Sequence, residues 1–446
     1  EEGWDFYGAL FPGSPVPLIG NNPNLAWSHT VNSPDLVDVY KLTLNKQNKN
    51  QYWFEGYWKD LEVREVFIKV KIVGPFSWTF RRTVKSSIHG PVLDFDHGSY
   101  ALRVSSIKDI RFVEQWYRMG KANDINEFKS AMKIHSIPMF NTGYADKDGI
   151  LYYVYNAKIP KRDSRFNWNK ILPGETKQAL WYDYIPFERL PQVYNPLEGF
   201  FQNCNSSPYL ATGSKVDASK PLPVWSGIET HQTNRALRSL ETFGIDHSIS
   251  REEFLHYKYD IEYSKESIFS IVRDRYVNEM KQNSIPDKLI PAIELLKNWD
   301  LRADSNNTAA ALAILALPNA FKMEDLKYET DAVTEKLLES ISFLEKHFST
   351  IEVPLGKVFR LKRGNLNLPL SGGPGTMRAI YSKKNGNHYK AVAGDCYIQA
   401  VEWGPEGQFN AWSVHQYGSA TKDDTSPHFN DQSTLFSKHK MKQIRP

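Results

Sequence analysis

The sequence has few cysteines and no long apolar run. Cys204 and Cys396 are its two cysteines, so it can form at most one disulfide, and their spacing matches no metal-binding pattern. The sequence leaves open whether these two side chains pair. No stretch approaches the roughly 18 consecutive apolar residues that a membrane-spanning helix needs. We therefore expect a globular protein that does not insert into a membrane.

A strong excess of charge of one sign is also missing. The 446 residues include 55 Lys and Arg against 51 Asp and Glu, for a formal net charge of +4. The basic residues are scattered among the acidic ones, whereas binding to a phosphate backbone needs a basic patch or stripe. The sequence therefore argues against nucleic acid as a partner.

Common catalytic motifs are absent as well. The chain contains no G-x-S-x-G nucleophile elbow, no H-E-x-x-H zinc motif and no glycine-rich loop followed by Lys-Ser or Lys-Thr. Ser105 to Lys108 matches S-x-x-K, but the companion K-T-G of serine acyl-transferases is missing. We therefore assign no nucleophile to this chain.

What the sequence does contain is a β, then α, then β pattern. Short alternating runs such as 63–73 and 150–155 predict strands, and Asp148-Gly149 predicts a hairpin turn between two of them. Ser248 to Glu253 has the composition of a helix start, and apolar residues then recur at helical spacing to about 350. We expect a β-rich core at 1–246, a mainly helical insertion at 247–375 and strands returning to the core at 376–446.

Three polar segments stand out within this pattern. Asparagines gather at 203–205, Arg235 and Arg238 lie three apart on a predicted helix, and Asp35 and Asp38 supply two carboxylates. Each segment has a structural explanation: asparagines shape turns, arginines at this spacing line solvated helix faces, and two carboxylates are too few for calcium. The segments carry little weight singly.

In their order along the chain, however, these and other segments resemble the β chain of the penicillin acylase family of N-terminal-nucleophile hydrolases, which includes acyl-homoserine-lactone acylases. The resemblance covers essentially the whole chain. Its segments are FPGSP at 11–15, LIGNN at 18–22, LAWSHT at 25–30, YAD at 144–146 with Gly149, NCN at 203–205, NR at 234–235, HQYG at 415–418 and SPH at 426–428.

The resemblance implies an α+β fold, a four-layer αββα sandwich carrying a helical insertion. It also implies hydrolysis of N-acyl amide bonds by a chain-terminal serine whose own α-amino group acts as the base. We expect that serine upstream of Glu1, as the first residue of the family's β chain, a few tens of residues before the segment that resembles Phe11 to Gly20. The expected partners are an α chain from the same precursor and a small N-acyl amide substrate, and the expected location is the periplasm or outside the cell.

The resemblance also implies roles for single residues. The side-chain amide of Asn205 and the backbone N–H of Val31 would form the oxyanion hole, with Arg235 positioning the asparagine. Asn203 and Arg238 are the competing choices. His29 and Ile19 match positions that line the acyl pocket; the alternative is that both serve packing alone.

A structural Ca²⁺ is the one cofactor that the resemblance implies. Its ligands in this chain would be Asp35, the carbonyl of Val37 and Asp38, with another ligand expected from the partner chain. A rival interpretation is a protein without catalytic activity: an exported protein that binds sugars or peptides, for which the many Trp and Tyr side chains would suffice.

Overall fold

The computed structural model describes residues 3–213, 222–282, 285–318, 328–405 and 407–444. The strands of its first half are β1 Tyr7–Ala9, β2 Ile19–Asn21, β3 Leu25–Thr30, β4 Val37–Leu42, β5 Gln51–Phe54, β6 Tyr57–Asp60, β7 Glu62–Val73, β8 Phe76–Ser86, β9 Pro91–Phe95, β10 Gly98–Val104, β11 Asn141–Asp146, β12 Leu151–Tyr155, β13 Leu172–Pro173 and β14 Gln192–Tyr194. Those of the second half are β15 Phe359–Arg363, β16 Leu366–Pro369, β17 Ile380–Asn385, β18 His388–Gly394, β19 Tyr397–Trp403, β20 Phe409–His415 and β21 Lys442–Gln443.

The helices fall into three groups along the chain. Two lie between β10 and β11, namely α1 Phe112–Lys121 and α2 Ile125–Met132. The largest group precedes β15 and comprises α3 Asn234–Thr242, α4 Arg251–Lys258, α5 Ile268–Gln282, α6 Ile290–Asn298, α7 Ala310–Ala316, α8 Thr330–Phe348 and α9 Leu355–Val358. The last helix is α10, Ser433–Ser437.

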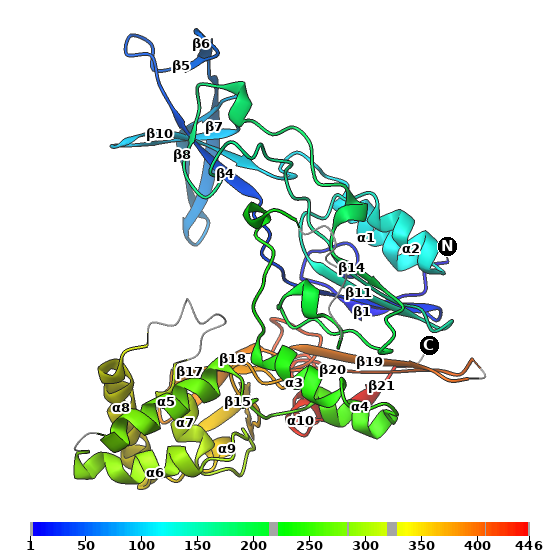
Figure 1. The fold of residues 1–446 in the computed structure, drawn as a ribbon, viewed down its shortest axis with the longest axis vertical. Coiled ribbons are helices and arrows are strands. Elements are labelled where there is room, and N and C mark those ends of the chain that lie inside the picture. The colour runs from blue at the N-terminus through cyan, green and yellow to red at the C-terminus, as the bar shows by residue number, and fades with distance from the viewer. Residues whose placement is uncertain (1–2, 214–221, 283–284, 319–327, 406, 445–446) are drawn as a thin grey trace.

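Two sheets stack in the centre of the molecule. One is antiparallel, in the order β1-β2-β3-β11-β12-β14, and the other is the sheet β19-β20-β21. They contact each other through Tyr7 Oη and Ser413 Oγ at 3.1 Å, and through Trp403 Nε1, which donates to the carbonyl of Pro23 at 2.8 Å. Helices α1 and α2 cover the first sheet and α3, α4 and α10 lie beyond the second (Figure 1). This is the expected four-layer αββα arrangement.

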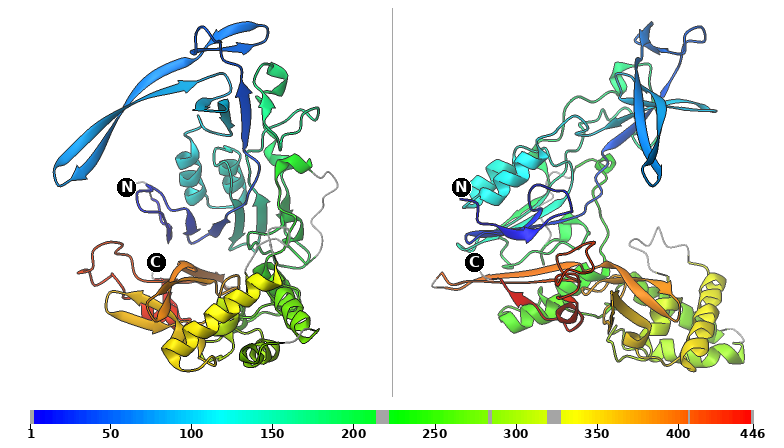
Figure 2. Two further views of the ribbon diagram at one scale, coloured as in Figure 1. Left: turned by 90° about the vertical axis from the view of Figure 1, so that its left-hand side faces the viewer. Right: turned by 180° about the vertical axis from the view of Figure 1, so that it is seen from behind.

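A second β region extends from this sandwich. Its sheet has the order β13-β4-β10-β9-β8-β7, and β5 and β6 form a separate hairpin. β7 and β8 pair over almost their whole length, and Figure 2 shows this long ribbon projecting from the rest of the molecule. Because β4 follows directly after the segment that contains Val31, this sheet anchors one end of the site described below.

The helical segment has a hydrophobic core of its own. Fully buried apolar side chains of α5 to α8 pack together, among them Tyr276, Leu296, Leu312, Leu337 and Leu344. The neighbouring sheet, β16-β15-β18-β17, joins strands from both sides of residue 375. The elements on each side of that expected boundary therefore belong to one sheet, and the three-part division stays a prediction.

A hairpin turn and a helix start lie where the sequence predicts them. β11 and β12 form the hairpin predicted at Asp148-Gly149. Gly149 has φ 80°, a backbone conformation that residues with a side chain rarely adopt. The helix expected to start near 248 begins at Arg251 with a capping box between Ser250 and Glu253. Both cysteines are free in the structure. Among the described residues no helix combines the length and apolar character needed to cross a bilayer.

Candidate active site

The side chain of Asn205 meets the main chain at Val31. Asn205 Nδ2 donates to the Val31 carbonyl at 2.7 Å, although 174 residues separate the two positions. Asn205 has φ 58°, a left-handed conformation that asparagine tolerates better than most residues. Val31 follows the last residue of β3 and is 52% exposed. The structure thus places the Asn205 amide against the main chain at Val31, at an accessible position; the contact is with the Val31 carbonyl, and the Val31 N–H that the resemblance implies as a donor belongs to the same residue.

Arg235 holds the other end of the same amide. Its Nη2 donates to Asn205 Oδ1 at 2.7 Å. Arg235 lies in the first turn of α3, which begins after the N-cap Thr233. Arg238, one turn further, is engaged elsewhere, by Asp260 at 2.6 Å and Glu241 at 2.7 Å. Of the two arginines, Arg235 is therefore the one in contact with Asn205.

Asn203 lies behind Asn205 and joins the loop to the first sheet. Its Oδ1 accepts hydrogen bonds from the hydroxyl of Thr30, from Asn141 Nδ2 and from the backbone N–H of Asn205. Its Nδ2 donates to the hydroxyl of Tyr153 at 3.1 Å. With both ends of its amide committed, Asn203 shapes the loop, and Asn205 is the amide directed at Val31.

The segment after Val31 is tied down by buried polar groups. Asn32 Oδ1 accepts from the backbone N–H of Phe140 at 2.8 Å. The N–H of Ser33 donates to Glu229 at 2.5 Å, and the other oxygen of this buried carboxylate accepts from the Tyr155 hydroxyl at 2.7 Å. These bonds fix the path of the main chain at Val31. No motif in the sequence marked Glu229, because its role depends on contacts with distant segments.

His29 sits in an aromatic environment on the helix-covered face of the first sheet. Trp27, Trp116 and Phe140 surround its ring at centroid distances of 5.2, 6.3 and 5.4 Å. Trp116 Nε1 donates to His29 Nε2 at 3.0 Å, so the ring proton belongs on Nδ1, which lies 3.2 Å from the carbonyl of Asn141. Burial lowers the pKa of His29 to about 4, while the Asn141 carbonyl acts in the opposite direction. His29 is therefore neutral at pH 7.

Ile19 does not join His29. β2 and β3 pair Gly20 with Trp27, so these two residues lie on one face of the sheet and Ile19 lies on the other. His29 is two residues after Trp27 in β3 and shares its face. The two residues predicted to line one acyl pocket therefore project from opposite faces of the first sheet.

Asp35 and Asp38, the expected calcium ligands, converge on an arginine. Arg162 Nη2 lies 3.0 Å from Asp35 Oδ1 and 3.0 Å from Asp38 Oδ2, and its side chain is completely buried. Burial raises the pKa of Asp38, against the opposing effect of Arg162. Within the ranges that the structure describes, no three His, Cys, Asp or Glu side chains are grouped to hold a metal. Two carboxylates and the carbonyl of Val37, beside a buried guanidinium, fit a dication that needs six to eight oxygens poorly.

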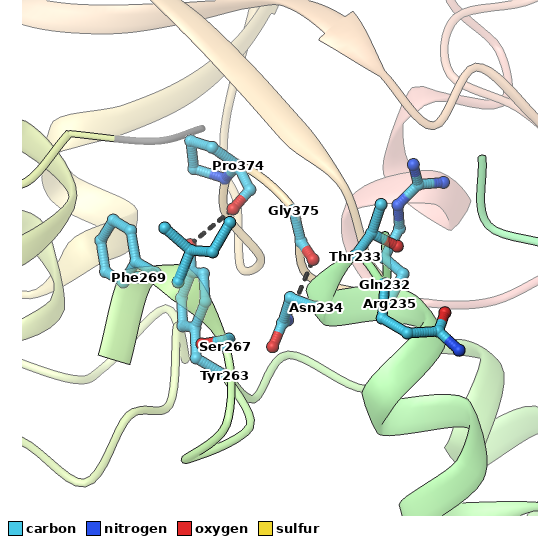
Figure 3. A pocket seen from close by; sticks show the side chains of 10 residues that line it. Gln232, Thr233, Asn234, Arg235, Tyr263, Ser267, Phe269, Pro374 and Gly375 are labelled. Carbon is cyan, nitrogen blue, oxygen red and sulfur yellow. Dashed lines mark hydrogen bonds between the residues drawn. The ribbon is translucent and has the colours of Figure 1, made fainter. Parts of the chain in front are cut away.

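A small hollow adjoins the site on the side of the helical segment. It is lined by Gln232, Thr233, Asn234, Arg235, Tyr263, Ser267, Ile268, Phe269, Pro374 and Gly375. Asn234 donates to the Gly375 carbonyl at 2.9 Å and Tyr263 to that of Pro374 at 3.0 Å, closing it (Figure 3). Its water-accessible volume of about 20 Å³ holds one water molecule, so it is too small for an acyl group.

Known proteins resemble this chain over almost its whole length. The model of the family described as Penicillin amidase matches residues 1–445. An acyl-homoserine lactone acylase PvdQ of Pseudomonas syringae pv. syringae is 27% identical over 97% of this chain and 62% of its own length. Penicillin G acylase of Escherichia coli is 29% identical over 46% of this chain and 24% of its own length.

A solved structure, that of a thermostable penicillin G acylase from Alcaligenes faecalis, is similar in fold. It aligns with a TM-score of 0.66 at 18% identity, over 100% of this chain and 89% of that chain. The chain described here spans a little over three fifths of the PvdQ relative's length.

Proposed function

This chain belongs to the penicillin amidase family, and from that premise we propose that it carries part of the active site of an acylase that hydrolyses N-acyl amide bonds. The observation that carries the proposal is the contact of the Asn205 amide with the main chain at Val31, with Arg235 on its far side. Penicillins and acyl-homoserine lactones are the substrate types that we propose, following the names of the relatives.

Asn205 and Val31 would stabilise the negative oxygen of the tetrahedral intermediate. A side-chain amide has two N–H donors, so Asn205 can keep one on the Val31 carbonyl and direct the other at an oxyanion. The cationic Arg235 at Oδ1 polarises the amide and strengthens its N–H groups as donors. A preorganised donor of this kind contributes about 3 to 4 kcal/mol to catalysis.

The nucleophile that we propose is a chain-terminal serine upstream of Glu1, with its own α-amine as the base. Its hydroxyl adds to the amide carbon, the C–N bond breaks as the amine departs with a proton, and water then hydrolyses the acyl-enzyme to the carboxylic acid. The acyl group is apolar in this proposal because His29 is neutral and enclosed by aromatic rings.

We also propose that a second polypeptide, the α chain of the same precursor, covers the β7–β8 ribbon. The register pairs Ile68 with Phe80 and Val70 with Trp78, so one face of the ribbon is apolar, and all four side chains are exposed. A two-stranded ribbon is only marginally stable alone in water. The PvdQ relative is longer than this chain, which leaves room for such a partner. Export of the protein described here to the periplasm or beyond is also part of the proposal.

The test is mass spectrometry and hydrolysis with the complete gene product. We expect two chains, the larger beginning at serine, and release of a fatty or aryl acid from an N-acyl amide. A single uncleaved chain without turnover would instead support an exported protein that binds sugars or peptides.

A further inference from the structure

Arg162 occupies the centre of the carboxylate pair where calcium is expected by resemblance. Its side chain has no accessible surface, and neither does that of Asp38. Nε donates to Asp38 Oδ2 at 3.0 Å, Nη2 donates to Asp35 Oδ1 at 3.0 Å, and Nη1 donates to the carbonyl of Trp225 at 3.0 Å. All three nitrogens of the guanidinium therefore donate to oxygens, and two of these oxygens belong to the carboxylates that would have to bind the metal.

Aromatic side chains complete the surroundings of this cation. The guanidinium carbon lies 5.5 Å from the centre of the Trp168 ring and 5.7 Å from that of Trp225. Trp181 Nε1 donates to Asp38 Oδ2 at 2.6 Å. A planar, weakly hydrated guanidinium suits a site of carboxylates and aromatic rings.

Charge supports the same conclusion. Two neighbouring carboxylates in a buried site need a positive charge, and Arg162 supplies one without a metal. A dication placed against the same oxygens would be repelled by the guanidinium. Arg162 binds one oxygen of each carboxylate, and Asp38 Oδ1 is buried without a hydrogen-bond partner among the described residues.

The cluster also adjoins the segment that carries Val31. The N–H of Asp35 donates to the carbonyl of Ser226 at 2.9 Å, and the chain passes so close there that a Cβ on Gly227 would lie 2.6 Å from this nitrogen. Arg162 thus ties the start of β4 to the 225–227 loop, which leads to Glu229.

We propose that Arg162 is a built-in cation that takes over the structural role expected of calcium, so that this protein needs no metal at Asp35 and Asp38. The proposal concerns this chain's own residues and holds whether or not the protein is an acylase.

The first test is metal dependence of the wild-type, full-length protein. We expect the same unfolding temperature with excess EGTA and with added Ca²⁺. We also expect no tryptophan-sensitised luminescence when Tb³⁺ is added, although Trp168, Trp181 and Trp225 are placed to excite an ion bound there. A lower unfolding temperature in EGTA, or sensitised Tb³⁺ emission abolished by Asp38→Asn, would overturn the proposal.

The second test is a charge cycle. Arg162→Met leaves the buried Asp38 and the partly exposed Asp35 without their cation and should lower the unfolding temperature strongly. Asp38→Asn in the same protein should restore part of the loss. Arg162→Lys, which keeps the charge but not the three-nitrogen fork, should unfold between wild type and Arg162→Met. If Arg162→Met does not fold, Arg162→Lys combined with the metal measurements still decides: wild-type stability in Arg162→Lys, or a calcium requirement of the wild-type protein, would contradict the proposal.

Discussion

Removing Asn205 and Arg235 singly and together tests whether they act as one unit. Asn205→Ala removes the proposed oxyanion donor, and loss of such a donor lowers kcat about 100- to 1,000-fold. Arg235→Met keeps the aliphatic length but removes the charged hydrogen bond to Asn205 Oδ1 at 2.7 Å. Such a bond contributes about 1.5 to 3 kcal/mol, so its loss should lower kcat about 10- to 150-fold.

The double variant separates two explanations. If Arg235 acts through Asn205, the double variant should be about as slow as Asn205→Ala alone. Independent action would multiply the effects, to about a thousandfold or far more. The assay is acid release from an N-acyl amide by the complete protein, with kcat and KM determined separately and thermal unfolding measured in parallel.

Arg238→Met is the matched control. Arg238 lies one turn along α3 and is bound to Asp260 and Glu241, so its loss should lower the unfolding temperature and leave kcat near normal. Multiplicative effects in the Asn205 and Arg235 cycle, or a loss of kcat in Arg238→Met equal to that in Arg235→Met, would refute this reasoning.

Three further predictions concern groups around the site. Glu229→Leu leaves the N–H of Ser33 and the hydroxyl of Tyr155 without their buried acceptor, so urea unfolding should show a loss of about 2 to 5 kcal/mol; a loss under 1 kcal/mol would contradict this role. Trp78→Ser on the apolar face of the β7–β8 ribbon should weaken retention of the second chain during purification, whereas Thr79→Ser on the opposite face should not; equal retention would exclude the ribbon as its contact. Acidification should destabilise the protein, because burial lowers the pKa of His29 and His89 from 6.5 to about 4. Between pH 6.5 and pH 4 these histidines are protonated in the unfolded chain and neutral in the native state. Each one therefore lowers the free energy of unfolding by up to about 1.4 kcal/mol per pH unit as the pH falls through this range. Urea unfolding at pH 7, 6 and 5 measures this slope, and equal stability at all three would count against it.

Local signals in the sequence were sufficient for several elements. The capping box of Ser250 and Glu253 and the turn at Gly149 arise from residues only a few positions apart, so their physics is contained in the sequence itself. The choice between Asn203 and Asn205 was not of this kind. Each asparagine shapes a turn equally well, so local physics does not distinguish them; the resemblance favours Asn205, and the structure shows its contact with Val31, 174 residues away.

The sequence by itself determined the order of β-rich and helical segments and, through its ordered motifs, the resemblance to one family. The tertiary structure alone decided which polar groups meet. It paired Arg235 with Asn205, placed Ile19 and His29 on opposite faces of a sheet, and brought Arg162 to Asp35 and Asp38. The reason is physical: strand and helix patterns depend on neighbouring residues, whereas a buried charge requires a partner that folding supplies from a distant part of the chain.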